Sequence, residues 1–234
     1  IKAVAFVGSS NVAKIVYSRS TALGKRALCL GGAKNHMIVV PDADQDSTAK
    51  GLLASSMGSA GQRCMAASVA IGVADIDHII DQLVEEAKAF ELGVDMGTII
   101  SKTALDRITN YIDDAEKMGA RVLIDGRTAP QPEEYKNGYW LGVTILDGVD
   151  PNWPCAKEEI FGPVLSIIRT DTLENAMKIE NENHYGNAAA VFTTSGEVAK
   201  MISESASAGM VGINIGVPVP REPYSFGGWN ESKY

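Results

Sequence analysis

The chain has 234 residues, of which 45% are hydrophobic, and this supplies enough apolar material for one large domain or two modest ones. Its formal net charge of −8 argues against a surface that binds nucleic acid or anionic lipid, because either surface needs clustered Lys and Arg. We therefore expect small molecules as binding partners, with neither nucleic acid nor a membrane among them.

The three cysteines include no Cys-x-x-Cys pair and no short Cys/His spacing, so we expect neither a disulfide framework nor a metal site. A reducing compartment fits best, which is the cytoplasm or, in a eukaryote, the mitochondrial matrix. The sequence has no apolar run of about 18 residues, and it begins "IKAVAF" without an initiator Met or a signal-peptide pattern. This start predicts a portion of a longer polypeptide.

The first 30 residues predict a strand, a helix and a second strand. Residues 3–7 are apolar, a Gly-Ser turn follows, a helix runs from about Asn11 to Leu23, and "RALCL" begins the next strand. Such a unit is the building block of a parallel sheet.

The rest of the chain continues this alternation. Strands are predicted at 36–40, 68–73, 121–125, 139–146, 164–169, 187–193 and 209–215, and helices at 46–57, 76–90, 102–118, 173–181 and 197–205. The pattern predicts an α/β fold with a largely parallel sheet covered by helices.

The stretch "SAGQRCMAAS", residues 59–68, contains the first candidate for chemistry. A thiol becomes a useful nucleophile when a cation, a helix N-terminus or a base lowers its pKa from about 8.5. Arg63 places a cation next to Cys64 in sequence, although residue type alone also fits a buried small hydrophobe. We interpret Cys29, in an apolar strand, and Cys155, after a Trp-Pro pair, as such buried residues.

The stretch "FVGSS", residues 6–10, is a Gly-Ser turn between the first strand and the first helix. The N–H groups and the hydroxyl of such a turn can approach a phosphate, and the helix dipole favours negative charge there. The turn lacks the three spaced glycines of the usual dinucleotide fingerprint. Ser9 or Ser10 as a plain helix cap is the alternative.

The stretch "KEEIFGPVLSI", residues 157–167, places two carboxylates before a Phe-Gly-Pro turn and an apolar strand. A carboxylate there can accept hydrogen bonds from ribose hydroxyls, and Phe161 can pack against a flat ring. Equally, Glu158 and Glu159 fit a solvated loop.

Taken together, "FVGSS", "LGGAKNH", "GSAGQRC", "EEIFGPV" and "GINIGVPVPREPYSFGGW", in this order, resemble the aldehyde dehydrogenase superfamily over essentially the whole chain. The resemblance implies an aldehyde dehydrogenase-like catalytic domain that uses NAD. "GAKNH" followed by "PDAD", "GQRCMA" and "GINIGVPVP" is most similar to the branch that oxidises methylmalonate and malonate semialdehyde and passes the acyl group to coenzyme A.

Matched position by position, the resemblance makes Cys64 the catalytic thiol. It places Gly8 and Ser9 at the cofactor pyrophosphate, Glu159 at the nicotinamide ribose and Phe161 near the nicotinamide.

Arg63 is our candidate for the substrate carboxylate, because a guanidinium binds a carboxylate in a bidentate, charge-assisted way. A purely structural arginine is the alternative.

One departure from the family pattern bears on the acyl acceptor. Hydrolytic members carry a Glu in "ELGGK" that helps to activate water, whereas here the position four before Lys34 is Leu30, and the neighbouring Cys29 is not acidic either. Without that base, attack by water is slow and the coenzyme A thiol can take the acyl group. For these semialdehydes the resemblance implies loss of the substrate carboxylate as carbon dioxide, which gives propionyl- or acetyl-coenzyme A.

The resemblance also implies a domain division. Residues 1–30 are expected to be the tail end of a dinucleotide-binding domain and 31–234 the catalytic domain, without the C-terminal oligomerisation segment, in a full-length protein that forms a dimer or tetramer. A hydrolytic dehydrogenase and an inactive piece unable to hold NAD remain alternatives. A cysteine protease or esterase is disfavoured because His36, His78 and His184 lie in no recognisable base motif.

Overall fold

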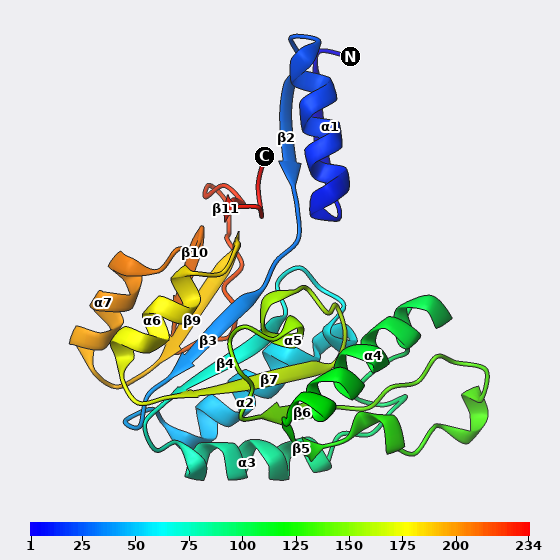
Figure 1. The fold of residues 1–234 in the computed structure, drawn as a ribbon, viewed down its shortest axis with the longest axis vertical. Coiled ribbons are helices and arrows are strands. Elements are labelled where there is room, and N and C mark those ends of the chain that lie inside the picture. Colours follow the sequence, from blue (N-terminus) through cyan, green and yellow to red (C-terminus); the bar gives the residue numbers. More distant parts are fainter.

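The computed structural model describes residues 1–234, and it divides into a projecting N-terminal unit and a larger body (Figure 1). The N-terminal unit consists of β1 (Ala3–Val7), α1 (Ser10–Ala22) and β2 (Arg26–Leu30). The two strands pair in parallel, with Ala3 opposite Arg26. This confirms the predicted strand, helix, strand unit.

The body is built on a seven-stranded sheet with the order β10-β9-β3-β4-β7-β6-β5. Its strands are β3 (Asn35–Val39), β4 (Ala67–Val73), β5 (Arg121–Ile124), β6 (Thr144–Asp147), β7 (Val164–Thr170), β9 (Ala188–Phe192) and β10 (Met210–Ile213). Every neighbouring pair is parallel except β5 and β6, which are antiparallel. The predicted α/β fold with a largely parallel sheet is therefore confirmed.

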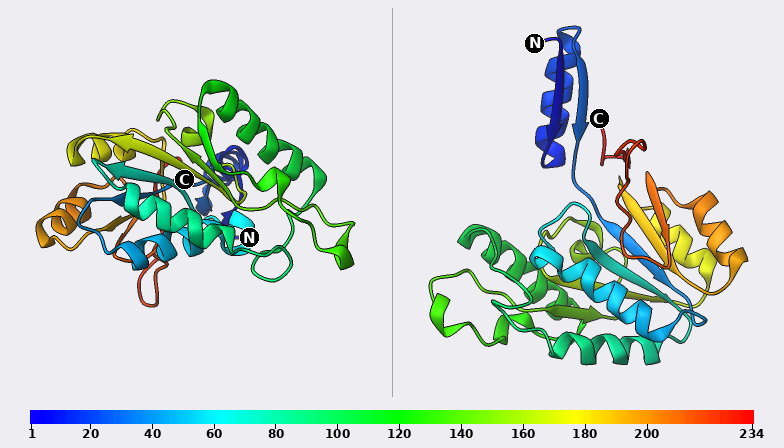
Figure 2. Two further views of the ribbon diagram at one scale, coloured as in Figure 1. Left: turned by 90° about the horizontal axis from the view of Figure 1, so that it is seen from below. Right: turned by 180° about the vertical axis from the view of Figure 1, so that it is seen from behind.

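Helices cover the sheet on both faces. They are α2 (Gln45–Met57), α3 (Asp77–Lys88), α4 (Lys102–Met118), α5 (Pro154–Lys157), α6 (Leu173–Asn181) and α7 (Gly196–Ser205), with short 3₁₀ turns at Gly58–Gly61, Gly126–Thr128 and Glu133–Tyr135. Helices α2 and α3 lie side by side on one face, and α6 lies on the other (Figures 1 and 2). None of these helices combines the length and the apolar character that crossing a bilayer requires.

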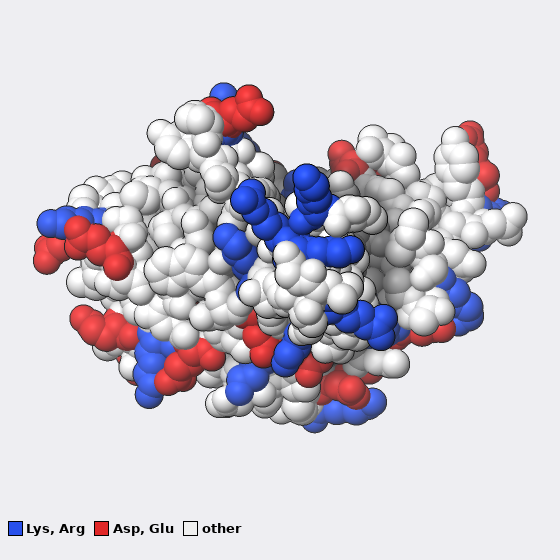
Figure 3. All heavy atoms as spheres, turned by 90° about the horizontal axis from the view of Figure 1, so that it is seen from above, with Lys and Arg blue, Asp and Glu red and all other residues white.

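Charge is distributed unevenly between the two parts. Residues 1–30 hold five of the 21 Lys and Arg and none of the 29 Asp and Glu. Figure 3 shows basic side chains gathered near the middle of the face seen from above, where the N-terminal unit projects. The acidic balance of the chain therefore belongs to the body.

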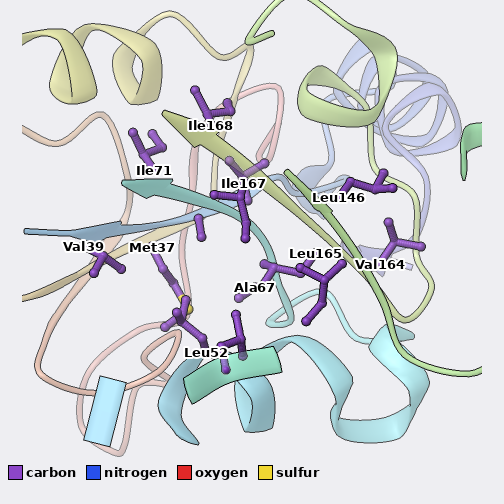
Figure 4. Packing of buried hydrophobic residues seen from close by; sticks show 14 of the residues in the cluster. Met37, Val39, Leu52, Ala67, Ile71, Leu146, Val164, Leu165, Ile167 and Ile168 are labelled. Atoms are coloured by element: carbon purple, nitrogen blue, oxygen red, sulfur yellow. The ribbon is translucent and has the colours of Figure 1, made fainter. Parts of the chain in front are cut away.

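Buried side chains fill both faces of the central strands (Figure 4). By strand register, Met37 and Ile167 share one face, and Ile71 lies on the face away from Leu52 on α2. Met37, Ile71 and Ile167 on β3, β4 and β7 are fully buried, as is Leu52 on α2. Strands covered on both faces read as continuous apolar runs, which explains "HMIVV" and "VLSII". Burial of each such side chain contributes about 1.5–3 kcal/mol to the free energy of folding. The sheet therefore holds the loops at its edge in fixed positions.

Two local expectations were wrong. The predicted strand over 139–146 begins only at Thr144, because the preceding residues bond elsewhere: the Gly142 N–H donates to the Gly126 carbonyl and the Trp140 indole to the Tyr135 carbonyl. Between the strands predicted at 139–146 and 164–169, where no helix was predicted, the structure contains the single helical turn α5.

The structure also contains a small ribbon that the sequence pattern did not indicate. Strands β8 (Tyr185–Gly186) and β11 (Trp229–Asn230) pair antiparallel. Beyond β11, Tyr234 exchanges backbone hydrogen bonds with Cys29 in β2. The end of the chain therefore ties the N-terminal unit to the body.

Candidate active site

A cavity of about 880 Å³ lies where the N-terminal unit meets the body. Most of its lining comes from three segments: the turn between β1 and α1, the loop between α2 and β4, and the segment between α5 and β7. All six residues predicted for the site line it, namely Gly8, Ser9, Arg63, Cys64, Glu159 and Phe161. Segments far apart in sequence thus meet at one place.

Cys64 is the one cysteine among the residues that line the cavity, and it is partly exposed. Cys29 and Cys155 are 0% and 1% exposed, as predicted for buried small hydrophobes. Burial also raises the pKa of the Cys155 thiol. Of the three thiols, Cys64 therefore has the access that a nucleophile needs.

The loop that carries Cys64 has an uncommon backbone. Ser59, Ala60 and Gly61 have φ values of 55°, 53° and 65°, three successive residues in the left-handed region. Gly61 lies directly against the Phe-Gly-Pro turn, and a Cβ added to it would lie 2.0 Å from the Gly162 carbonyl oxygen. This close approach brings the "GQRC" and "EEIFGP" motifs together, with Phe161 also at positive φ (56°).

The Gly-Ser turn leaves a hydroxyl free at the N-terminus of α1. Ser9 occupies the N-cap position, but its side chain makes no capping hydrogen bond and the residue is exposed. The Ser10 side chain, in contrast, links α1 to the segment after β2, because its Oγ accepts a hydrogen bond from the Gly32 N–H at 2.8 Å. A helix N-terminus with an unused hydroxyl and a flanking glycine suits the pyrophosphate of a dinucleotide.

Glu159 is held in the cavity wall and is not a solvated loop residue. Its Oε1 accepts the Ala33 N–H at 3.0 Å, and a Cβ on Gly32 would lie 2.9 Å from its Oε2. Burial raises the pKa of Glu159, opposed by the Ala33 hydrogen bond and the charges of Lys34 and Arg107. Glu158, in contrast, is exposed.

Arg63 makes structural contacts and also lines the cavity. Its Nη2 donates to the Ala54 and Ser55 carbonyls at 3.3 and 3.0 Å, at the C-terminal end of α2. A guanidinium has five N–H donors, so others remain for a ligand carboxylate. The structure places Arg63 beside Cys64 in the cavity wall, and its role toward substrate stays a prediction.

Among the cavity residues that were not predicted, two have polar side chains. Arg107 on α4 directs Nη1 toward the Glu159 carbonyl at 3.4 Å, and no motif distinguished it within an amphipathic helix. Gln62 stands inside "GQRC", and its Oε1 accepts the Ile100 N–H at 2.9 Å while its Nε2 donates to the Thr98 carbonyl at 3.0 Å. Gln62 thereby ties the cysteine loop to the loop before α4.

Comparison with known protein families identifies the class of protein that has this fold. The model of the aldehyde dehydrogenase family matches residues 1–234. The chain belongs to the aldehyde dehydrogenase family.

Among curated relatives, malonate-semialdehyde dehydrogenase of Pseudomonas aeruginosa is 42% identical over 100% of this chain and 48% of its own length. The mitochondrial, acylating methylmalonate-semialdehyde/malonate-semialdehyde dehydrogenase of Bos taurus is 44% identical over 97% of this chain and 43% of its own length. The chain therefore spans about half the length of the curated relatives it matches.

Solved structures of aldehyde dehydrogenases also match the whole of this chain and about half of their own length. A methylmalonate-semialdehyde dehydrogenase from Oceanimonas doudoroffii matches with a TM-score of 0.97 and 41% identity, over 100% of this chain and 49% of that one. Betaine aldehyde dehydrogenase from Staphylococcus aureus, solved with NAD+, matches with a TM-score of 0.92 and 26% identity, over 100% of this chain and 47% of that one.

Proposed function

We propose that this chain is the catalytic portion of an NAD-dependent dehydrogenase that converts malonate or methylmalonate semialdehyde into acetyl- or propionyl-coenzyme A. In this proposal residues 1–30 end the cofactor-binding domain, 31–234 form the catalytic domain, and the full-length protein is a dimer or tetramer. The observation that carries the proposal is the convergence of Cys64, Ser9 and Glu159 on one cavity.

The first step is addition of the Cys64 thiolate to the aldehyde carbon. Sγ forms a bond to that carbon, and the carbonyl electron pair moves to the oxygen. The Cys64 backbone N–H donates a hydrogen bond to this oxyanion. Arg63 binds the carboxylate at the other end of the substrate and so aligns the aldehyde with the thiol.

When bound, NAD would supply the acceptor for the hydride on the carbon attached to Cys64. The residues present fit this group: Gly8 and Ser9 would hold the pyrophosphate at the start of α1, and Glu159 would hold the nicotinamide ribose. Phe161 would lie near the nicotinamide. Loss of the hydride leaves a thioester on Cys64.

Release of the acyl group depends on what can attack that thioester. Glu159 is the one carboxylate among the residues that line the cavity, and the Ala33 N–H already engages it. Cys29, near the position of the hydrolytic glutamate, is fully buried in β2. In this proposal the bond to the substrate carboxylate breaks, carbon dioxide leaves, and the resulting enolate takes a proton from solvent. The coenzyme A thiol then attacks the thioester in preference to water, takes the acyl group and releases Cys64 as the thiolate.

The bovine relative's printed name includes "acylating", which supports coenzyme A as the acceptor. The rival is a hydrolytic dehydrogenase. The test is to give the full-length protein NAD and malonate semialdehyde with and without coenzyme A, using Cys64→Ser as the control. We expect acetyl-coenzyme A and little turnover without coenzyme A. Free acid formed at the same rate in its absence would favour the hydrolytic rival.

A further inference from the structure

Two buried amide side chains meet behind Cys64. Asn35, 1% exposed, is the first residue of β3, and Asn187, 6% exposed, directly precedes β9. Strands β9, β3 and β4 are parallel neighbours, so their first residues lie at the same edge of the sheet. The cysteine loop ends where β4 begins, at Ala67. The sheet therefore places both amide side chains beside the end of this loop.

Both amides donate to the same atom. Asn35 Nδ2 donates to the Cys64 carbonyl oxygen at 2.9 Å, and Asn187 Nδ2 donates to that oxygen at 3.0 Å. Asn35 Nδ2 also donates to the Ala66 carbonyl at 2.7 Å, and its Oδ1 accepts from Asn187 Nδ2 at 3.0 Å. Since carbonyl oxygens only accept, each amide must direct its NH₂ group toward the loop.

The cysteine loop needs such a restraint. Ser59 and Ala60 hold left-handed backbone that residues with a Cβ seldom adopt, so local preference does not fix the loop. Anchoring the Cys64 carbonyl in the interior fixes the plane of the following peptide and limits rotation about the Cα–C bond of Cys64. With its carbonyl turned into the protein, the residue is left with its thiol on the cavity side.

We propose that Asn35 and Asn187 are positioning residues that clamp the Cys64 carbonyl and so aim the thiol and its neighbouring N–H at the aldehyde. The inference rests on the proposed function, in which Cys64 adds to an aldehyde. A purely structural role would lower stability when either amide is lost, without changing how well a folded Cys64 adds to an aldehyde. The two roles therefore separate by measurement.

The experiment measures how strongly propanal protects Cys64 of the 234-residue chain against iodoacetamide. Propanal has no carboxylate, so its addition does not depend on Arg63. Asn187→Ala removes one donor, and Asn187→Asp keeps the shape but sets an acceptor against the Cys64 carbonyl. We expect the apparent dissociation constant for propanal to rise about tenfold in Asn187→Ala and further in Asn187→Asp, because small displacements of a reacting group cost up to about a hundredfold.

Thr193→Val is the matched control. Thr193 is 2% exposed, lies just beyond the opposite end of β9, and donates its hydroxyl to Asp42 at 2.9 Å. Its loss removes a buried hydrogen bond far from the cavity, so we expect a lower unfolding midpoint with an unchanged propanal constant.

Unchanged propanal constants in both Asn187 variants, beside a lowered midpoint, would overturn the clamp. A wild-type Cys64 that propanal does not protect would instead count against the proposed function. A crystal structure of Asn187→Asp then still decides the clamp. A Cys64 carbonyl that turns away from the interior supports it, and one that keeps its direction overturns it.

Discussion

Arg63 is bound on one side to the end of α2 and exposed on the other to the cavity. In the full-length protein, Arg63→Leu should reduce turnover of malonate semialdehyde far more than that of propanal, because only the first offers an anion. A lost charge-assisted pair costs about 1.5–3 kcal/mol, or roughly tenfold to more than a hundredfold in kcat/KM. Arg107→Leu is the comparison at a second cavity cation. Equal losses on both aldehydes would assign Arg63 a structural role.

The buried side chain of Lys34 predicts that the free energy of unfolding depends on pH. Its Nζ donates to the Cys155 carbonyl at 2.8 Å, and burial lowers its pKa from 10.5 to about 8. The unfolded chain keeps this proton up to about pH 10.5, whereas the folded chain releases it near pH 8. Between these values the unfolded state binds more protons, so the free energy of unfolding rises with pH.

The measurement compares the wild type with Lys34→Met in denaturant unfolding from pH 7 to 10. The wild type should gain stability relative to the variant by up to about 1.4 kcal/mol per pH unit above pH 8. Lys102→Met, at an exposed helix position, is the control and should follow the wild type. Parallel curves for the wild type and Lys34→Met would show that Lys34 does not bind its proton more weakly in the folded state.

At the scale of elements, the "GQRC" loop and the Phe-Gly-Pro turn depend on each other. Gly61→Ala would place a Cβ 2.0 Å from the Gly162 carbonyl oxygen at a φ of +65°. Backbone strain and overpacking together should lower the free energy of unfolding by about 2 kcal/mol or more. Gly97→Ala, where the Cβ meets nothing within 4 Å, is the control. Equal denaturation midpoints for the two variants would contradict the tight approach.

The regular elements followed from local pattern. Helices α4 and α6 begin and end where predicted because Ser101 and Thr172 cap them and their apolar residues recur at helical spacing. The two-residue strands β8 and β11 could not be predicted, because their pairing depends on where a distant segment lies.

The sequence predicted only part of the candidate site. The short motifs made their residues candidates, and the family resemblance selected the six predicted cavity residues, whose roles remain predictions. Arg107, Asn35 and Asn187 lie in ordinary helix and strand surroundings, and the tertiary fold alone brings them to Cys64 or Glu159. Asn35 stands inside the quoted stretch "GAKNH", but the stretch does not indicate which atom its side chain contacts.

At the scale of the whole molecule, the N-terminal unit differs from the body: it is basic, and it leaves apolar side chains exposed to solvent. Val7, Ile15 and Leu28 are 67%, 51% and 42% exposed, so much apolar surface of this unit faces solvent. We predict that the 234-residue chain binds NAD only weakly, with half-saturation above about 1 mM, the upper end of usual KM values. It should accordingly show no turnover with NAD, coenzyme A and a semialdehyde. Micromolar binding in a fluorescence titration would contradict this prediction.

The central claim is that Cys64 is the nucleophile, and the most direct measurement is limited alkylation of the native chain followed by peptide mapping. Cys64 lines the cavity, whereas Cys29 and Cys155 are buried within β2 and α5. We predict that iodoacetamide modifies Cys64 first, and that the other two thiols react at comparable rates only after denaturation. Faster labelling of Cys29 or Cys155 in the folded chain would contradict the claim.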